Sequence, residues 1–426
     1  MPQILVKKFG GTSVGSIERI QSLAQRLARD FARGERPVVV VSAMAGETNR
    51  LIGLMDQIDA SNRGPSYDML VASGEQVSVA LLSAALERLG LKTSPMLGFQ
   101  LGILTDSTHA KARIQTLNAS RLIELASSGV IPVVAGFQGV GADGSITTLG
   151  RGGSDTTAVA LSAQLRLMNS PLDSGVCEIY TDVPAVFTAD PRLIPKAREM
   201  KRVDAEEMME MASLGSKVLH IRSVELAAKF GVRIHLRSSF EDREGTWIES
   251  TLASKGPEMV KAVHPNVDLE EPVVAAVTHD ANTSVFQLEP IETRPQFLAD
   301  LFRKLAEKGV VVDIITQSES KDGHRLAFSV TREDVPLTQS VLEGFLPSTV
   351  KVRLFDNMAK LSIVGQGMRH HTGVAARFFE ALASIDVQMH LITTSEIKVS
   401  AVIALDKLED AARQVHSQFG LDRAES

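Results

Sequence analysis

The chain of 426 residues is poor in cysteine and in the larger aromatics, with one Cys, one Trp and two Tyr. A single cysteine, Cys177, excludes an intramolecular disulfide and is typical of a reducing compartment. We expect Cys177 to be a small buried apolar residue of a strand. The chain also lacks a block of basic residues and carries a formal net charge of −6. These absences argue against base stacking and against a nucleic-acid partner.

Long apolar runs are also missing. The N-terminal stretch MPQILVKKFGGTS has only a short apolar run, and its charges follow that run, which is the wrong order for a signal peptide. No run approaches the ~20 residues needed to span a bilayer. We therefore expect a cytoplasmic protein with no membrane partner.

The residues that are present indicate a folded α/β protein. Hydrophobic residues make up 44% of the chain, and its length predicts two or three domains. Strand patterns alternate with helix patterns, which favours a mostly parallel central sheet. Strands are predicted at residues 3–10, 36–44, 93–98, 130–137 and 177–183, and helices at residues 16–34, 75–90, 118–129 and 154–167.

The last third of the chain has a different organisation. We predict a first domain over residues 1–250 and a polar, proline-containing linker over residues 251–271. Two similar units follow, at residues 272–355 and 356–426, and each is expected to have the ferredoxin-like order βαββαβ. Such units usually bind a ligand or pair their sheets, although a purely structural role is the alternative.

The stretch KKFGGTSVGS, residues 7–16, places Lys8 at a strand end just before Gly10 and Gly11. Glycines let backbone N–H groups approach phosphate oxygens, and a lysine adds a point charge. The stretch is not a Walker A motif, because no Lys-Ser or Lys-Thr follows the second glycine. An ordinary glycine turn is the alternative interpretation.

Two further stretches bring polar side chains to the ends of apolar elements. In VVVVSAMAGETNRL, Ser42 and Thr48 follow a buried strand, where open α/β sheets bind ligands. The alternative is a strand-to-helix turn with Thr48 as the helix N-cap. Glu75 is predicted to open an apolar helix, where it either gains from the helix dipole or binds a substrate ammonium group.

The stretch TTLGRGGSDTTAVAL, residues 147–161, puts Arg151 and Asp155 into a glycine-rich turn at the start of a helix. Such a helix start is suited to an anion. Two later stretches also combine charge with turn residues, namely YTDVPAVFTADPRLIP and SLGSKVLHIRS.

Together these motifs resemble the aspartokinase family, whose members phosphorylate the side-chain carboxylate of L-aspartate. KFGGTSVGS, VSAMAGETNRL, GFQGV, TTLGRGGSDTTAVAL, YTDVPAVFTADPR and GSKVLH occur in the family's order and at its spacing. The resemblance implies a three-layer amino-acid kinase fold followed by two ACT domains, with ATP and Mg²⁺ as cofactors.

The resemblance also implies a role for each motif residue. Lys8 and Asp155 would be catalytic, with Asp155 orienting the active-site lysines. The predicted substrate-binding residues are Ser42, Thr48, Glu75 for the α-ammonium group, Arg151 for the α-carboxylate, Gly152, Gly153 and Ser154. The predicted nucleotide-binding residues are Lys8, Phe9, Gly10, Gly11, Thr181, Asp182, Phe187, Arg192 and Lys217. No dedicated metal ligands are predicted, because Mg²⁺ is expected to accompany the ATP phosphates.

The chain departs from the family in two places. Ala185 and Phe187 stand where members often have Gly and Tyr, and Ala185 is expected to strain a turn that needs a positive φ. In the first ACT unit, Thr293, Arg294, Pro295 and Gln296 replace an Asp-x-Pro-Gly loop, and Gln317-Ser318 replaces Gln-Asn. We therefore expect weakened or altered feedback by lysine or threonine, in a homodimer or larger assembly.

Two alternatives remain open at the level of sequence. One is a related kinase acting on glutamate, acetylglutamate or a nucleotide, and the other is a non-catalytic amino-acid sensor. The pairing of Glu75 with Arg151 favours a substrate with a free amino group.

Overall fold

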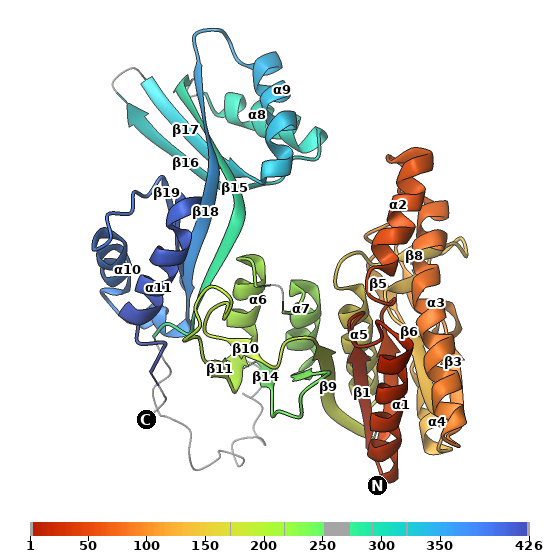
Figure 1. Ribbon diagram of the computed structural model, residues 1–426. Helices are drawn as coiled ribbons and strands as arrows, with labels where there is room; N and C mark the ends of the chain where they lie inside the picture. The colour runs from red at the N-terminus through yellow and green to blue at the C-terminus, as the bar shows by residue number, and fades with distance from the viewer. Residues whose placement is uncertain are drawn as a thin grey trace. The chain divides into compact units, whose positions relative to one another are not determined.

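The structure, a computed structural model, describes residues 3–170, 172–216, 218–250, 273–291, 294–320 and 323–423. These residues form two compact units (Figure 1). The N-terminal unit is drawn from Met1–Val186, Glu199–Ala212 and Lys217–Val267. The C-terminal unit is drawn from Phe187–Arg198, Ser213–Ser216 and Asp268–Ser426.

The N-terminal unit is built on an eight-stranded sheet in the order β12-β14-β13-β9-β1-β2-β6-β3. Its strands are parallel except for the β13–β14 pair, which is antiparallel. This confirms the mostly parallel sheet predicted from the apolar strand patterns. The strands are β1 (Ile4–Phe9), β2 (Arg36–Val41), β3 (Thr93–Met96), β6 (Ile131–Ala135), β9 (Asp173–Thr181), β12 (Arg202–Asp204), β13 (Arg233–Ser238) and β14 (Thr246–Glu249).

Helices cover both faces of this sheet. On one face, α1 (Ile17–Ala32) and α3 (Pro65–Arg88) form a core with Phe9 and Val41 of the strands. Because side chains alternate along a strand, Lys8 points to the opposite face, where α5 (Gly153–Leu167) packs against β1 and β9.

Helix α3 differs from its predicted extent. It begins at Pro65, ten residues before Glu75, so Glu75 lies in mid-helix and the helix dipole does not explain it. Length and apolar composition would allow α3 to cross a membrane. The helix instead packs against α1, β3 and β6, and half of its most apolar window is buried.

Several short elements of the N-terminal unit have no clear sequence pattern and were not predicted. A second sheet has the order β5-β4-β7-β8. Its strands are β4 (Leu104–Thr105), β5 (Ile114–Thr116), β7 (Gln138–Val140) and β8 (Ile146–Thr148). Helix α4 (Ser120–Ser127) lies within the helix predicted over residues 118–129 and confirms it. The other helices up to residue 230 are α2 (Glu47–Asp59), α6 (Ala205–Ser213) and α7 (Ile221–Phe230), and two short strands are β10 (Val186–Phe187) and β11 (Glu199–Met200).

The C-terminal unit contains one antiparallel sheet in the order β16-β17-β15-β18-β20-β19. The long strands β15 and β18 run through its middle (Figure 1). The strands are β15 (Ala276–Ile291), β16 (Val312–Ser320), β17 (Gly323–Val330), β18 (Lys351–Val364), β19 (Leu391–Thr394) and β20 (Lys398–Ala404). The helices are α8 (Pro295–Glu307), α9 (Val335–Phe345), α10 (Val374–Ala383) and α11 (Leu408–Gln418).

The second ferredoxin-like unit is completed differently from the predicted order. No strand follows α11 in the described part of the chain, which ends at residue 423. The missing strand is the first part of β15, where Ala276 pairs with Val364 and Asp280 pairs with Lys360. Val277 accordingly belongs to the core around Phe378. The predicted linker, residues 251–271, lies outside the described residues.

Candidate active site

The carboxyl ends of β9, β1, β2 and β6 lie side by side in the N-terminal unit. The Gly10 N–H donates to Tyr180 O at 3.2 Å, Ser42 N–H donates to Phe9 O at 3.1 Å, and Gly136 N–H donates to Val41 O at 3.0 Å. These bonds place Gly10, Ser42 and Gly136 in one row beyond the strand ends. Open α/β sheets bind their ligands at this edge.

Lys8 and Asp155 meet beside this row. Lys8 Nζ lies 2.6 Å from Asp155 Oδ1, and each residue is 9% exposed. Asp155 belongs to the first turn of α5, whose N-cap Gly152 has a left-handed backbone and offers no capping side chain. The N-terminal turn of a helix and the Lys8 charge together suit an anionic ligand.

Of three glycines around the pair, Gly11 and Gly136 leave no room for a Cβ, and Gly10 leaves the space beside the Lys8 ammonium group open. A Cβ on Gly10 would lie 3.5 Å from Lys8 Nζ. A Cβ on Gly11 would lie 2.8 Å from Ala43 O, and one on Gly136 would lie 2.7 Å from Ser154 Cβ. Side chains at these positions would fill the space beside Lys8 or force the strand ends apart. The residues present therefore fit a polyphosphate group.

Glu75 is a buried carboxylate with an unused acceptor. Its Oε1 accepts a hydrogen bond from Ala43 N–H at 3.0 Å, whereas the buried Oε2 has no partner among the described residues. Burial raises the pKa of Glu75 to about 7. An incoming ammonium group would supply the missing donor and favour the ionised carboxylate.

The two hydroxyl residues near this carboxylate are placed by β2 and α2. Ser42 is half-buried and directly follows β2. Thr48 is half-buried in the first turn of α2, whose N-cap is Gly46. The alternative that Thr48 is the N-cap is therefore wrong.

Arg151 is exposed, and the turn that carries it is held from several sides. Leu149 N–H donates to Phe137 O at 2.9 Å. Arg222 donates from Nη1 to Leu149 O at 2.5 Å and from Nη2 to Ala112 O at 3.0 Å. The guanidinium group thus ties the Arg151 turn to a second loop. Arg222 lies in the stretch SLGSKVLHIRS, but no role was predicted for it from the sequence.

Asp68 supports the same turn and was also missed. It is fully buried and accepts hydrogen bonds from Thr148 Oγ1 and from Ala110 N–H, the latter at 3.0 Å. Asp68 Oδ2 also lies 2.6 Å from His109 Nδ1. Ala110 has a left-handed φ of 64°, which is uncommon for a residue with a Cβ. An aspartate in an apolar helix stretch is the only sequence signal for this cluster.

The predicted nucleotide-binding residues are divided between the two units. Thr181 is the last residue of β9, and its Oγ1 donates to Asp182 Oδ1 at 3.1 Å. Phe187 and Arg192 belong to the C-terminal unit, where Arg192 Nη2 lies 2.8 Å from Asp190 Oδ2. Lys217 lies outside the described residues. Ala185 is buried and is not among the described residues with a positive φ, so the strain expected there is wrong.

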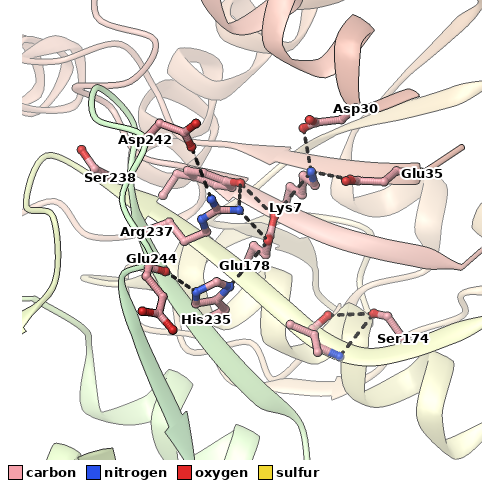
Figure 2. A network of polar contacts seen from close by, with 12 residues as sticks. Lys7, Asp30, Glu35, Ser174, Glu178, His235, Arg237, Ser238, Asp242 and Glu244 are labelled. Atoms are coloured by element: carbon pink, nitrogen blue, oxygen red, sulfur yellow. Dashed lines mark hydrogen bonds and ion pairs between the residues drawn. The ribbon is translucent and has the colours of Figure 1, made fainter. Parts of the chain in front are cut away.

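Lys7 lies on the other face of β1 from Lys8 and is held in a separate charge network (Figure 2). Its Nζ lies 2.7 Å from Asp30 Oδ2, 2.6 Å from Glu35 Oε2 and 3.4 Å from Glu178 Oε2. Burial acts to raise the pKa of Glu178, but His235, Lys7 and Arg237 outweigh it and lower that pKa to about 2. The network joins β1, β9, β13 and α1.

No group of three or more His, Cys, Asp or Glu side chains suited to a metal ion occurs among the residues described.

Comparison with known proteins supports this description of the chain. The model of the amino acid kinase family matches residues 3–238, and an ACT domain model matches residues 361–419. The chain is 41% identical over 421 residues to the aspartokinase of Helicobacter pylori, covering 99% of this chain and 100% of that protein. It is 42% identical over 422 residues to the aspartokinase of Pseudomonas aeruginosa, covering 98% of each.

Solved structures show the same fold. The aspartate kinase from Synechocystis is 37% identical with a TM-score of 0.53, covering 99% of this chain and 70% of that one. Escherichia coli aspartokinase III, solved with aspartate and ADP, has a TM-score of 0.76 at 24% identity, covering 98% of this chain and 99% of that one. The chain therefore belongs to the amino acid kinase family and, within it, to the aspartokinases.

Proposed function

We propose that this chain transfers the γ-phosphoryl group of ATP to the side-chain carboxylate of L-aspartate, which yields ADP and 4-phospho-L-aspartate. We place the reaction in the cytoplasm, as the entry step toward lysine, threonine and methionine. The observation that carries the proposal is the Lys8–Asp155 pair, which lies at the glycine-lined carboxyl edge of a parallel sheet. Full-length similarity to aspartokinases supports it.

Lys8 is proposed to stabilise the transferring phosphoryl group. Negative charge spreads over its oxygens in the transition state, so a fixed ammonium group and fixed N–H donors lower the barrier without covalent chemistry. Asp155 would keep the Lys8 ammonium charged and aimed at the strand-end row. Backbone N–H groups at Gly10 and Gly11 and at the start of α5 would complete the anion site.

Aspartate is proposed to bind through its α-amino and α-carboxylate groups. The unpaired Oε2 of Glu75 would accept from the ammonium group, and Arg151 would donate a bidentate pair of bonds to the α-carboxylate. Ser42, Thr48 and Ser154 would donate hydroxyl hydrogen bonds. No residue is needed as a general base, because the attacking carboxylate is already ionised at neutral pH.

Two anions must approach each other in this reaction. Mg²⁺ bound to the ATP phosphates would offset their charge, and it would need few protein ligands. Thr181, Asp182, Phe187, Arg192 and Lys217 are proposed to contact the nucleotide, and a homodimer or larger assembly is proposed to form through the ACT units.

A coupled ADP-release assay tests the function. Purified full-length protein with ATP and Mg²⁺ is expected to release ADP with L-aspartate, and much less with L-glutamate or N-acetylglutamate. Preference for either of the other two substrates would assign a related kinase, and activity with none would favour the sensor alternative. Hydroxylamine trapping of the acyl phosphate distinguishes aspartate phosphorylation from simple ATP hydrolysis.

A further inference from the structure

The C-terminal unit contains a cavity of about 590 Å³. One wall is the segment Ile194–Lys196, and the other is α11 with the residues next to its ends. This cavity is separate from the α8 loop near Arg294, where the family resemblance would place an effector. All its lining residues belong to one compact unit.

Helix α11 presents a polar stripe to the cavity. Lys407, Asp410, Gln414 and Ser417 line it at helical spacings of three and four residues. Residues at these spacings share one face of a helix. Gln414 Nε2 is held by a hydrogen bond to Ser384 Oγ at 3.1 Å. The spacing explains how one helix contributes several polar groups to the same wall.

Charges of both signs line the cavity. Lys196, Lys407 and Arg413 are cationic, whereas Asp410 and Asp422 are anionic. Arg413 donates from its Nε to Leu193 O at 3.3 Å, and its Nη2 forms an ion pair with Glu409. A ligand with a single charge would be attracted by one set and repelled by the other, so the lining favours a molecule that carries both charges.

Asp422 is the residue best suited to bind the positive group of such a ligand. Its Oδ1 is shielded from solvent and has no hydrogen-bond partner among the described residues. A buried carboxylate oxygen without a donor is costly, and an ammonium group would supply the donor. The cavity also contains apolar surface from Ile194, Pro195 and Ile385, which suits a short aliphatic skeleton.

We propose that this cavity binds a free amino acid, with its ammonium group at Asp422 and Asp410 and its carboxylate at Lys196 and Lys407. This site is additional to the substrate site and to any effector site at the α8 loop.

The wall that contains Ile194 connects the cavity to residues proposed to contact the nucleotide. It belongs to residues 187–198, which several hydrogen bonds join to the ACT core. Thr188 Oγ1 lies 2.9 Å from His416 Nε2, Val277 N–H donates to Thr188 O at 2.8 Å, and Arg198 Nε donates to Leu421 O at 2.8 Å. The same residues include Phe187 and Arg192. If their proposed nucleotide contacts hold, occupancy of the cavity changes the KM for ATP.

Isothermal titration calorimetry on the full chain tests the binding. The probes are L-alanine, L-threonine, L-valine and L-methionine, with butyrate and butylamine as analogues that each lack one charge. Ser417→Trp fills the cavity from an exposed helix position, and Asp422→Asn removes the carboxylate. Ser340→Trp, at an exposed position of α9, is the matched control.

The expected result is that at least one amino acid binds wild type and Ser340→Trp alike. Its Kd should rise at least tenfold in Ser417→Trp and in Asp422→Asn, and both analogues should bind at least tenfold more weakly. Failure of all four amino acids to bind, or binding unchanged by Ser417→Trp, would overturn the proposal. Calorimetry needs no turnover, so a failed kinase assay leaves this test intact.

Discussion

Lys7 and Lys8 are adjacent in β1 but belong to different ion-pair networks on opposite faces of the sheet. Lys7 Nζ lies 2.7 Å from Asp30 Oδ2, and Lys8 Nζ lies 2.6 Å from Asp155 Oδ1. Lys7 joins β1 to α1 and β9, whereas Lys8 faces the glycine-lined strand ends. One lysine therefore has a structural position, and the next has the position that we propose to be catalytic.

Substitution of each lysine by methionine should separate the two roles. Lys8→Met is expected to lower kcat by about 10²-fold or more, because the phosphoryl group loses its fixed positive charge. Lys7→Met is expected to lower the free energy of unfolding by about 2–3 kcal/mol, because the partly buried Asp30 and Glu35 lose the Lys7 cation. Glu178 keeps its ion pair with Arg237. Urea titration and the ADP-release assay check both variants.

The loss of stability in Lys8→Met should be the smaller one, because the α5 N-terminus still stabilises Asp155. Equal effects of the two variants on both kcat and stability would contradict the assignment.

Arg151→Ala should discriminate between the two substrates. We expect the KM for aspartate to rise at least tenfold, because the α-carboxylate loses its bidentate partner; a tenfold change corresponds to about 1.4 kcal/mol. The KM for ATP should change less than about twofold. Initial rates with each substrate varied in turn provide the measurement. Parallel increases in both KM values would refute a specific contact with the α-carboxylate.

Glu75→Gln should stabilise the ligand-free protein in a pH-dependent way. Burial raises the pKa of Glu75 from 4.5 to about 7. Ionisation of Glu75 therefore costs the folded state no stability below about pH 4.5, where the carboxyl group is protonated in both the folded and the unfolded state. The loss of stability grows as the pH rises from 4.5 to 7 and reaches its full value above pH 7. That full loss is about 3 kcal/mol, at about 1.36 kcal/mol per pH unit.

Urea titrations of wild type and Glu75→Gln at pH 5 and pH 8 check this prediction. The gain in unfolding free energy should be much larger at pH 8, while the KM for aspartate rises because the ammonium group loses its ionic partner. A gain of the same size at both pH values would contradict the buried ionisation.

Arg222→Lys should loosen the backbone turn that carries Arg151, although Arg222 is not among the residues proposed to contact the substrate. A lysine keeps the charge but lacks the planar fork that reaches both Leu149 O and Ala112 O. We expect the KM for aspartate to rise severalfold, with the KM for ATP little changed. The control is Arg121→Lys, which affects an exposed ion pair on α4 and should leave both KM values unchanged.

Feedback should be weak or altered. Arg294 is the N-cap residue of α8, Pro295 begins the helix, and Gln296 stands where the family resemblance places a glycine, whereas Thr293 lies outside the described residues. We expect millimolar lysine and threonine, alone and together, to inhibit only slightly. Strong synergistic inhibition in the ADP-release assay would show that the altered loop still recognises its effector.

The sequence by itself determined the parallel sheet, because runs such as RPVVVV are apolar on both faces of a strand. It also placed the substrate motifs at strand ends and at the start of α5, since glycines and charges interrupt the apolar pattern there. Local patterns of this kind depend on residues close together in the chain.

The tertiary structure decided the relationships between distant residues. In KKF the alternation of side chains separates Lys7 from Lys8, but only the packing of α1 and α5 shows which face contains the site. Burial in mid-helix, and not a helix terminus, sets the pKa of Glu75. The contacts of Asp68 with Thr148, of Arg222 with Leu149 and of Ala276 with Val364 each join residues more than 70 positions apart, so no local sequence pattern records them.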